Sequence, residues 1–223
     1  MAEATEGAAQ DRLDWRDIDL TRFNNSWWKP GRGMVWITLW RLFGMPLVKH
    51  LPDETLGGEL FNWLRLFILR LFGAKIGKGV VMRSCEVYYP WNLEIGDHVW
   101  IGYESNLYSL VKIRLGNNVC VSQRAFLCAG THDPYEPTFG LMVGEIHLKD
   151  GAWVAAGAFV GPGVTLHEGA VAAAGSVVVK DLPAMTICGG NPAKPIKPRT
   201  ILPRAVPRPG LRNSASPEAP PEA

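Results

Sequence analysis

The chain has 223 residues, 47% of them hydrophobic, and a formal net charge of +2 at pH 7. This length allows one large domain or two small ones. The near-zero charge, without a basic stripe interleaved with aromatic residues, argues against a nucleic-acid partner.

The N-terminal residues and the cysteines indicate where the protein resides. Residues 1–20 are expected to be flexible, and the first eleven of them, MAEATEGAAQD, are acidic and lack the basic and apolar parts of a signal peptide. Residues 34–48 are very apolar, but they are interrupted by Arg41 and are too few to span a bilayer comfortably. The four cysteines form no CxxC pair, so we expect them to be reduced and the protein to be cytoplasmic.

Residues 21–73 are expected to form an apolar, helical cap region. Within residues 59–73, apolar side chains recur at helical spacing and further ones widen the same face. These are Leu60, Leu64, Phe67 and Leu71, widened by Phe61, Trp63, Ile68 and Phe72. One interpretation is a cap that covers the open end of the following domain. The other, compatible with it, is an interfacial segment at the inner face of the cytoplasmic membrane, because Trp and Phe lie beside Arg41, Arg65 and Arg70.

Residues 74–197 are expected to form one domain, and about residues 74–188 of it repeat with a period of six. From Leu148 the chain reads LKDGAW, VAAGAF, VGPGVT, LHEGAV, AAAGSV, VVKDLP, and earlier hexads begin at Ile95, Ile101, Leu107, Leu115, Val121 and Leu127. The first position is apolar, and the fifth is mostly small or β-branched. Because these positions are two residues apart on a strand, both point inward. Gly at the fourth position suits a turn with positive φ. The pattern predicts an all-β solenoid, a parallel β-helix with three hexads per coil.

The six-residue rhythm is interrupted twice. A two-residue slip falls at Ile113 and Arg114, and a polar, turn-rich loop is expected over residues 133–147. His132 precedes this loop and follows Thr131, which is expected to face inward, so His132 should point outward at a corner roofed by the loop. An imidazole can take a proton from an alcohol. Position alone does not distinguish this role from that of a surface histidine.

The repeats, the segment AGTHDPYEP and the closing run VVVKDLPAMTICGGNPAKPIKPR resemble hexapeptide-repeat O-acetyltransferases. These include galactoside, maltose and nodulation-factor enzymes and, over about residues 60–198, the colanic acid biosynthesis acetyltransferases. The resemblance implies a left-handed parallel β-helix and a homotrimer with sites between subunits. It implies acetyl transfer from acetyl-CoA to a sugar hydroxyl of an exopolysaccharide or lipid-linked oligosaccharide precursor. His132 would be the general base, the hydroxyl would attack the thioester directly, and no metal is expected.

The same resemblance implies which residues bind the donor. Trp153 would lie along the CoA site, Ala156 would offer its backbone N–H to the thioester oxygen, and Ala174 would contact the pantetheine arm. Lys180, Lys194 and Lys197 would lie near the CoA phosphates, where cations are needed.

The acceptor residues are less well defined by the resemblance. Glu104 and Asn106 are the candidates from an earlier coil. Asp133 either orients His132 or bonds to the local backbone at the start of the loop.

Two other functions remain open. A zinc-dependent hydratase of the γ-carbonic anhydrase type would need converging ligands, and His132, His147 and His167 show no obvious convergence. A non-catalytic solenoid scaffold is disfavoured by the intact segment around His132. The proline-rich tail, residues 198–223, is expected to be disordered.

Overall fold

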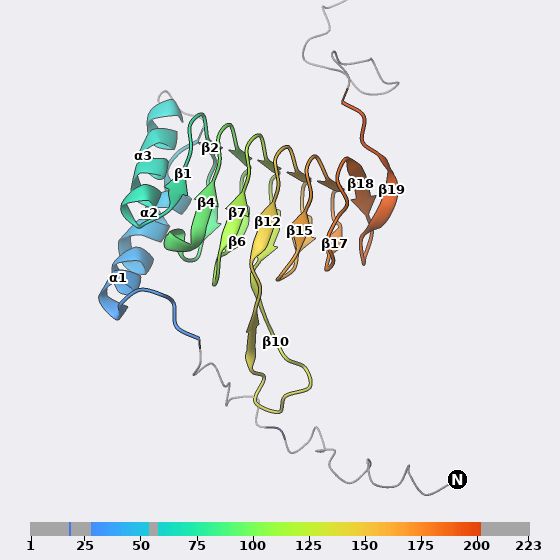
Figure 1. The fold of residues 1–223 in the computed structure, drawn as a ribbon. Helices are drawn as coiled ribbons and strands as arrows, with labels where there is room; N and C mark the ends of the chain where they lie inside the picture. Colours follow the sequence, from blue (N-terminus) through green and yellow to red (C-terminus); the bar gives the residue numbers. More distant parts are fainter. Residues whose placement is uncertain (1–17, 19–27, 54–57, 202–223) are drawn as a thin grey trace, which may run out of the picture.

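The chain forms a row of β-coils that is covered at one end by helices (Figure 1). The computed structural model describes residues 18, 28–53 and 58–201. The expected flexible N-terminus, except for Ile18, and residues 202–223 of the expected disordered tail lie outside these residues. The start of that tail is ordered, because Pro198 ends a strand and Arg199 donates hydrogen bonds to Gly151 and Gly169.

Three sheets form the walls of the solenoid, and we call them sheets A, B and C in the order in which each coil visits them. Sheet A contains β1 (Lys75–Ile76), β4 (Leu93–Ile95), β7 (Ile113–Leu115), β12 (Ile146–Leu148) and β15 (Thr165–Leu166). Sheet B contains β2 (Val81–Met82), β5 (Trp100–Ile101), β8 (Cys120–Val121), β13 (Trp153–Val154), β16 (Val171–Ala172), β18 (Thr186–Gly189) and β19 (Lys194–Pro198). Sheet C contains β3 (Glu86–Val87), β6 (Asn106–Tyr108), β9 (Phe126–Cys128), β14 (Phe159–Val160) and β17 (Val177–Val178). Neighbouring strands pair in parallel, except that β19 pairs antiparallel with β18 and closes the C-terminal end.

The interior is filled by the first and fifth positions of the hexads, as the sequence predicts. Ala152, Val154, Ala158 and Val160 are fully buried, and the same alternation continues through the other coils. The fourth-position glycines from Gly151 to Gly175 have φ between 64° and 78°. In earlier hexads, non-glycine residues take this left-handed conformation at His98, Glu104, Asn118 and Arg124. The predicted parallel β-solenoid is confirmed.

The expected loop is a β-hairpin that projects from the solenoid (Figure 1). It consists of β10 (Gly130–His132) and β11 (Leu141–Val143), which pair antiparallel. Two details differ from expectation. Thr131 is exposed rather than inward-facing, because the chain leaves the wall at Gly130. At the other end, Ile146 and His147 already belong to β12, where Ile146 pairs with Ile113.

The two-residue slip also lies elsewhere than expected. Ile113 is fully buried and belongs to a regular strand, so it is not part of the irregularity. The extra residues are Ser109 and Leu110, which are buried at the corner between sheets C and A. A 3-10 helix, η3 (Pro90–Asn92), occupies the same corner one coil earlier, and Asn92 Nδ2 donates to the carbonyls of Ser109 and Leu110 at 2.9 and 3.0 Å.

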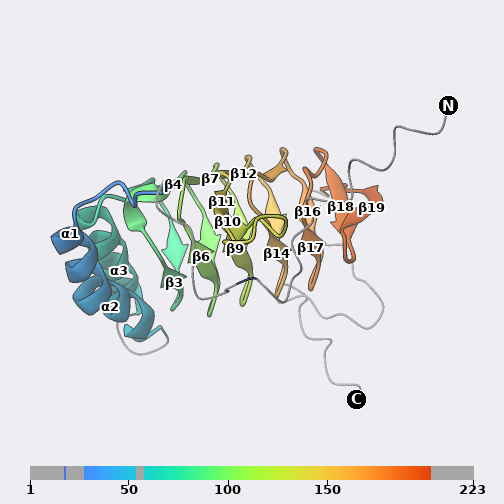
Figure 2. The same ribbon diagram turned by 90° about the horizontal axis from the view of Figure 1, so that it is seen from below.

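The predicted helical cap is confirmed, and both views place it at the N-terminal end of the solenoid (Figures 1 and 2). It comprises α1 (Met34–Leu39), the π-helix η2 (Trp40–Gly44), α2 (Met45–His50) and α3 (Gly58–Leu71). In the described residues, no helix is long and apolar enough to cross a membrane.

The face of α3 that packs on the solenoid differs in part from the predicted one. Ile68 and Phe72, which widen the predicted face, are buried together with Leu66 and Leu69. Leu60, Phe67 and Leu71 of the predicted stripe are exposed. The predicted stripe is the outer face of the helix because a second apolar face lies opposite to it.

Candidate functional site

One groove brings together four of the six residues predicted to bind CoA. It has a volume of about 790 Å³ and lies along sheet B and the turns that lead from sheet B to sheet C, which we call the B–C corner. Trp153, Ala156, Ala174 and Lys197 line it. Lys180 and Lys194 do not line this groove.

β13 positions Trp153 on the outer face of sheet B. Val154 is fully buried, so the alternation of the strand directs Trp153 outward, where its side chain remains 40% exposed. In the ladder, Trp153 pairs with Cys120 and Val171, and its Nε1 donates to Ser122 Oγ at 2.9 Å. This hydrogen bond fixes the indole ring as one wall of the groove.

The B–C corner supplies backbone donors to the groove. Each turn stacks on the next through one hydrogen bond, such as Gly157 N to Gln123 O at 3.0 Å and Gly175 N to Ala156 O at 2.9 Å. Among the described residues, the N–H groups of Ala156 and Ala174 have no backbone acceptor. Both residues line the groove, so such N–H groups can stabilise negative charge that develops on a bound thioester oxygen.

Basic residues from the last strand and the segment after it line the groove. Lys197 enters from β19, and Arg199 follows it in the groove wall. Arg199 also donates to the carbonyls of Gly151 and Gly169 at 2.7 and 2.9 Å, so its position is fixed by two coils. Sequence reasoning missed Arg199, and the only signal was its place in the basic run after the last hexad.

Ser122 and Gln123 also line the groove and were missed. They follow the first position of a hexad, which places them at the B–C corner. The equivalent residues one coil later are Ala155 and Ala156. Because Ala156 is predicted to contact the donor, this equivalence could have indicated Ser122 and Gln123 from the sequence.

His132 lies at the end of β10 and is part of the hairpin rather than roofed by it. Its backbone pairs with Leu141, and its Nδ1 lies 2.7 Å from the carbonyl oxygen of Phe139. A carbonyl oxygen can only accept, so Nδ1 carries the proton and the lone pair of the neutral ring is on Nε2. The hairpin therefore holds the imidazole in the tautomer that a base acting through Nε2 requires.

Asp133 takes the local role among the two that the sequence allows. Its Oδ1 accepts a hydrogen bond from Tyr135 N at 2.8 Å, as in an Asx-turn. The carbonyl of Phe139, rather than the carboxylate of Asp133, contacts Nδ1 of His132.

The groove and His132 lie at different corners of one chain. The hairpin leaves the coil between β9 of sheet C and β12 of sheet A, whereas the groove lies along sheet B and the B–C corner. No described residue of the hairpin lines the groove.

Glu104 and Asn106 line a smaller pocket of about 330 Å³ on the B–C corner, nearer to the helical cap. Asn106 Nδ2 donates to Glu86 at 3.0 Å, and the other oxygen of Glu86 pairs with Lys49. Asn106 Oδ1 is buried without a hydrogen-bond partner in the described part of the chain. Glu104 pairs with Arg124 at 2.6 Å. The pocket thus offers a buried acceptor that a hydroxyl group can satisfy.

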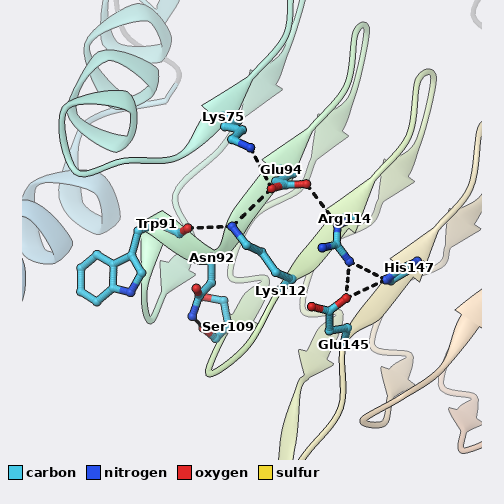
Figure 3. Close-up of polar contacts among 9 residues, drawn as sticks. All are labelled: Lys75, Trp91, Asn92, Glu94, Ser109, Lys112, Arg114, Glu145 and His147. Carbon is cyan, nitrogen blue, oxygen red and sulfur yellow. Dashed lines mark hydrogen bonds and ion pairs between the residues drawn. The ribbon is translucent and has the colours of Figure 1, made fainter. Parts of the chain in front are cut away.

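A second concentration of charge lies on the outer face of sheet A (Figure 3). Glu94 lies 3.1 Å from both Lys75 Nζ and Arg114 Nε and 3.3 Å from Lys112 Nζ. The hydrogen bonds from Lys75, Lys112 and Arg114 lower the pKa of Glu94 to about 2. These ion pairs join β1, β4 and β7. With Glu145, which pairs with Arg114, the cluster holds three cations and two carboxylates and so keeps a net charge of +1.

The histidines do not form a metal site. His147 Nε2 lies 2.8 Å from Arg114 and 3.2 Å from Glu145, in the same network (Figure 3). His132 is held by the hairpin, and His167 lies near Glu168. Among the described residues, no three His, Cys, Asp or Glu side chains are grouped so that they could hold a metal ion.

Comparisons with known proteins agree with this fold. No protein-family model matches the chain. The chain is 46% identical over 141 residues to a protein of Escherichia coli K12 named colanic acid biosynthesis acetyltransferase WcaF, covering 63% of this chain and 77% of that protein.

Solved structures have the same architecture. A maltose O-acetyltransferase from Clostridium difficile 630 superposes with a TM-score of 0.60 at 25% identity, covering 76% of this chain and 90% of that chain. A hexapeptide-repeat acetyltransferase from Vibrio cholerae, solved with acetyl coenzyme A, has a TM-score of 0.64. It is 19% identical and covers 85% of this chain and 100% of that chain, which establishes similarity of fold.

Proposed function

The chain belongs to the hexapeptide-repeat acetyltransferases, and we propose that it transfers the acetyl group of acetyl-CoA to a saccharide hydroxyl. The acceptor would be a precursor of an exopolysaccharide or of a lipid-linked oligosaccharide. The groove that gathers Trp153, Ala156, Ala174 and Lys197 is the observation that carries the proposal. The relative named for colanic acid biosynthesis supports a polysaccharide acceptor, and the Vibrio protein solved with acetyl coenzyme A supports the donor.

The groove suggests how the donor lies. Lys197 and Arg199 would face the CoA phosphates, because both are cations that line the groove. Trp153 and Ala174 would flank the pantetheine arm. The N–H of Ala156 would point to the thioester oxygen and stabilise the charge that develops there.

The chemistry would be a direct acyl transfer with His132 as base. Nε2 takes the proton of the acceptor hydroxyl while the oxygen attacks the thioester carbonyl. The new C–O bond forms, the C–S bond breaks, and the sulfur of CoA takes the proton from the imidazolium. The hydrogen bond from Nδ1 to Phe139 stabilises the charged ring during this step.

A complete site would need two copies of the chain. His132 and the groove lie at different corners, so we propose that the hairpin of one copy reaches the groove of the next, in a homotrimer. The hairpin projects from the solenoid, and its Tyr135 is 94% exposed, as expected for a segment that docks on another copy (Figure 1).

The acceptor would approach along the B–C corner from the side of the helical cap. Asn106 and Glu104 lie on this corner, in coils closer to the cap than Ala156. The buried Asn106 Oδ1 would accept a hydrogen bond from a sugar hydroxyl. Asp133 would act through the hairpin, by supporting the turn that holds His132.

The first test replaces the base. His132→Ala should lower acetyl-CoA-dependent release of CoA thiol by about 10²–10⁴-fold in the presence of an acceptor found by screening. CoA affinity measured by calorimetry should be unchanged, because the groove is intact. His167→Ala, which alters another exposed histidine, is the control. Near-full activity of His132→Ala would contradict the mechanism.

The second test asks whether two copies share a site. Ala174→Asp should block the groove, and His132→Ala should remove the base, so each variant alone is inactive. Oligomers refolded from an equal mixture should regain about a quarter of the wild-type activity, since half of the hairpins and half of the grooves are intact. If each chain contains a complete site, the mixture stays inactive.

No observation favours a hydratase, because the described histidines do not converge. A scaffold without turnover would require that the chain fail to bind CoA, which the same calorimetry measures.

A further inference from the structure

The helical cap has an apolar outer face as well as an apolar inner face. On α3, Leu60, Trp63, Phe67 and Leu71 lie on one stripe at helical spacing, and each is about half exposed or more. Trp63 and Phe67 stack on each other, with ring centroids 5.5 Å apart. Leu66 and Leu69, which pack on the solenoid, occupy the opposite side of the helix.

The segment from α1 to α2 continues this surface. Ile37, Trp40 and Val48 are buried against the rest of the protein. Trp36 and Met45 are partly buried against the core. The exposed apolar side chains of the segment are Met34, Val35, Leu39, Leu42, Phe43 and Leu47. α2 packs against α3, so the two helical segments lie side by side across the end of the solenoid (Figure 2).

The cations of this segment turn away from the outer face. Arg41 donates to the hydroxyl of Tyr89 at 3.1 Å and lies over the Tyr89 ring. Lys49 pairs with Glu86 on β3. An apolar surface of this breadth marks an interaction site, because the exposed side of a helix at a water interface is normally polar.

The cap and the first strand of the solenoid carry more positive than negative charge. Residues 28–53 and 58–80 contain eight Lys and Arg but only two acids, Asp53 and Glu59. One cation, Arg65, is buried in a pair with Asp53, while Lys29, Arg32, Arg70 and Lys78 are exposed. We call the exposed cations Lys29, Arg32, Arg70 and Lys78 the cationic rim. An apolar, aromatic surface flanked along the chain by exposed cations is complementary to the surface of an anionic bilayer.

We propose that the outer face of α1, η2, α2 and α3 docks on an anionic lipid bilayer. The apolar side chains enter the boundary between headgroups and acyl chains, and the rim cations pair with lipid phosphates. No helix among the described residues is long enough to span the bilayer, so the contact is peripheral. A second copy of the chain would bind this face less favourably than an anionic bilayer, because two cationic rims would repel each other.

The test is flotation of the full-length protein with vesicles of equimolar phosphatidylcholine and phosphatidylglycerol. The wild type should float with these vesicles and bind less to vesicles of phosphatidylcholine alone. Phe43→Gln and Phe67→Gln should each lower the partition coefficient by about tenfold, and together by about a hundredfold. The matched control, Val179→Gln with Ile196→Gln, alters two apolar side chains that are more than half exposed at the other end of the solenoid and should float as the wild type does.

Three outcomes would overturn the proposal. One is failure of the wild type to float. If removal of residues 1–27 then allowed the protein to bind the vesicles, the occupant of the face would be that segment instead of lipid. Another is unchanged flotation of the double variant. The third is a change in its oligomeric state without any change in flotation, which would assign the face to a second copy. Unfolding midpoints of all variants show whether the fold is intact.

Discussion

At the scale of single residues, Arg65 joins the helical cap to the first coil. It is fully buried, donates to the carbonyls of Val48, Leu51 and Met82 at 2.7–2.8 Å, and pairs with Asp53 at 3.1 Å. Arg65→Met would leave these partners unsatisfied, so we expect the free energy of unfolding to fall by about 3–5 kcal/mol. Urea unfolding measures this. Arg70→Met, at an exposed position on the same helix, should change it by about 0.5 kcal/mol or less. Equal effects of the two substitutions would contradict this role.

Glu94 provides the pH-dependent prediction. Its pKa is lowered from 4.5 to about 2 in the folded protein by its three basic neighbours. A depressed folded pKa stabilises the protein above the unfolded pKa, and this stability is lost as the pH falls from about 4.5 towards 2. The gap in stability between wild type and Glu94→Gln should therefore be about 1 kcal/mol at pH 7 and should close at low pH. Thermal unfolding at a series of pH values measures the gap, and a gap that widens on acidification would contradict the assignment.

At the scale of elements, the two irregularities of the solenoid support each other. Ser109 and Leu110 bulge at the corner from which the hairpin leaves one coil later. A Cβ at Gly130, the first residue of β10, would lie 2.6 Å from Leu110 Cδ1. The two extra residues therefore support the first strand of the hairpin and determine where His132 lies.

The close approach of Gly130 to Leu110 leads to a prediction for Gly130→Val. The added side chain should displace the root of the hairpin. With His132 as the proposed base, this should lower kcat by about a hundredfold, because small shifts of catalytic groups are costly. CoA affinity should be unchanged, since the groove lies at another corner. Gly33→Val, at a position where a Cβ meets no atom within 4 Å, is the control. Loss of CoA binding by Gly130→Val would indicate general damage instead.

The same elements show what the sequence can predict. The hexads predict the walls because the first and fifth positions must face inward on every strand, and Val154 and Ala158 do so. The packing face of α3 is not predictable from periodicity, because a helix with two apolar faces has no unique inner side. Arg65 was interpreted as a membrane-facing cation for this reason, although it is buried. The hydrogen-bond partner of His132 Nδ1 depends on the turn of the hairpin, because this turn brings the carbonyl oxygen of Phe139 next to the ring.

At the scale of the whole molecule, the two ends of the solenoid have different surfaces. The cap closes the N-terminal end with an apolar surface and a cationic rim, and β19 closes the C-terminal end beside the groove. Trp153 lies three strands from β2 in sheet B. With about 4.8 Å per strand and about 10 Å for the helical layer, it would lie roughly 25 Å from a bilayer under the cap. The donor would then approach from the aqueous side and the acceptor from the membrane side.

This arrangement predicts how lipid should affect activity. An acceptor saccharide anchored to lipid in phosphatidylglycerol-containing vesicles should be acetylated faster than the same saccharide free in solution, because docking raises its effective concentration. Phe43→Gln with Phe67→Gln should abolish this advantage and leave the rate on the free saccharide unchanged, since the groove and the hairpin are untouched. Measurement of CoA thiol release with both acceptors separates the two effects. A matching loss on the free saccharide would mean that the substitutions damage the solenoid, and an advantage that persists in the variant would mean that the cap does not bring the enzyme to its acceptor.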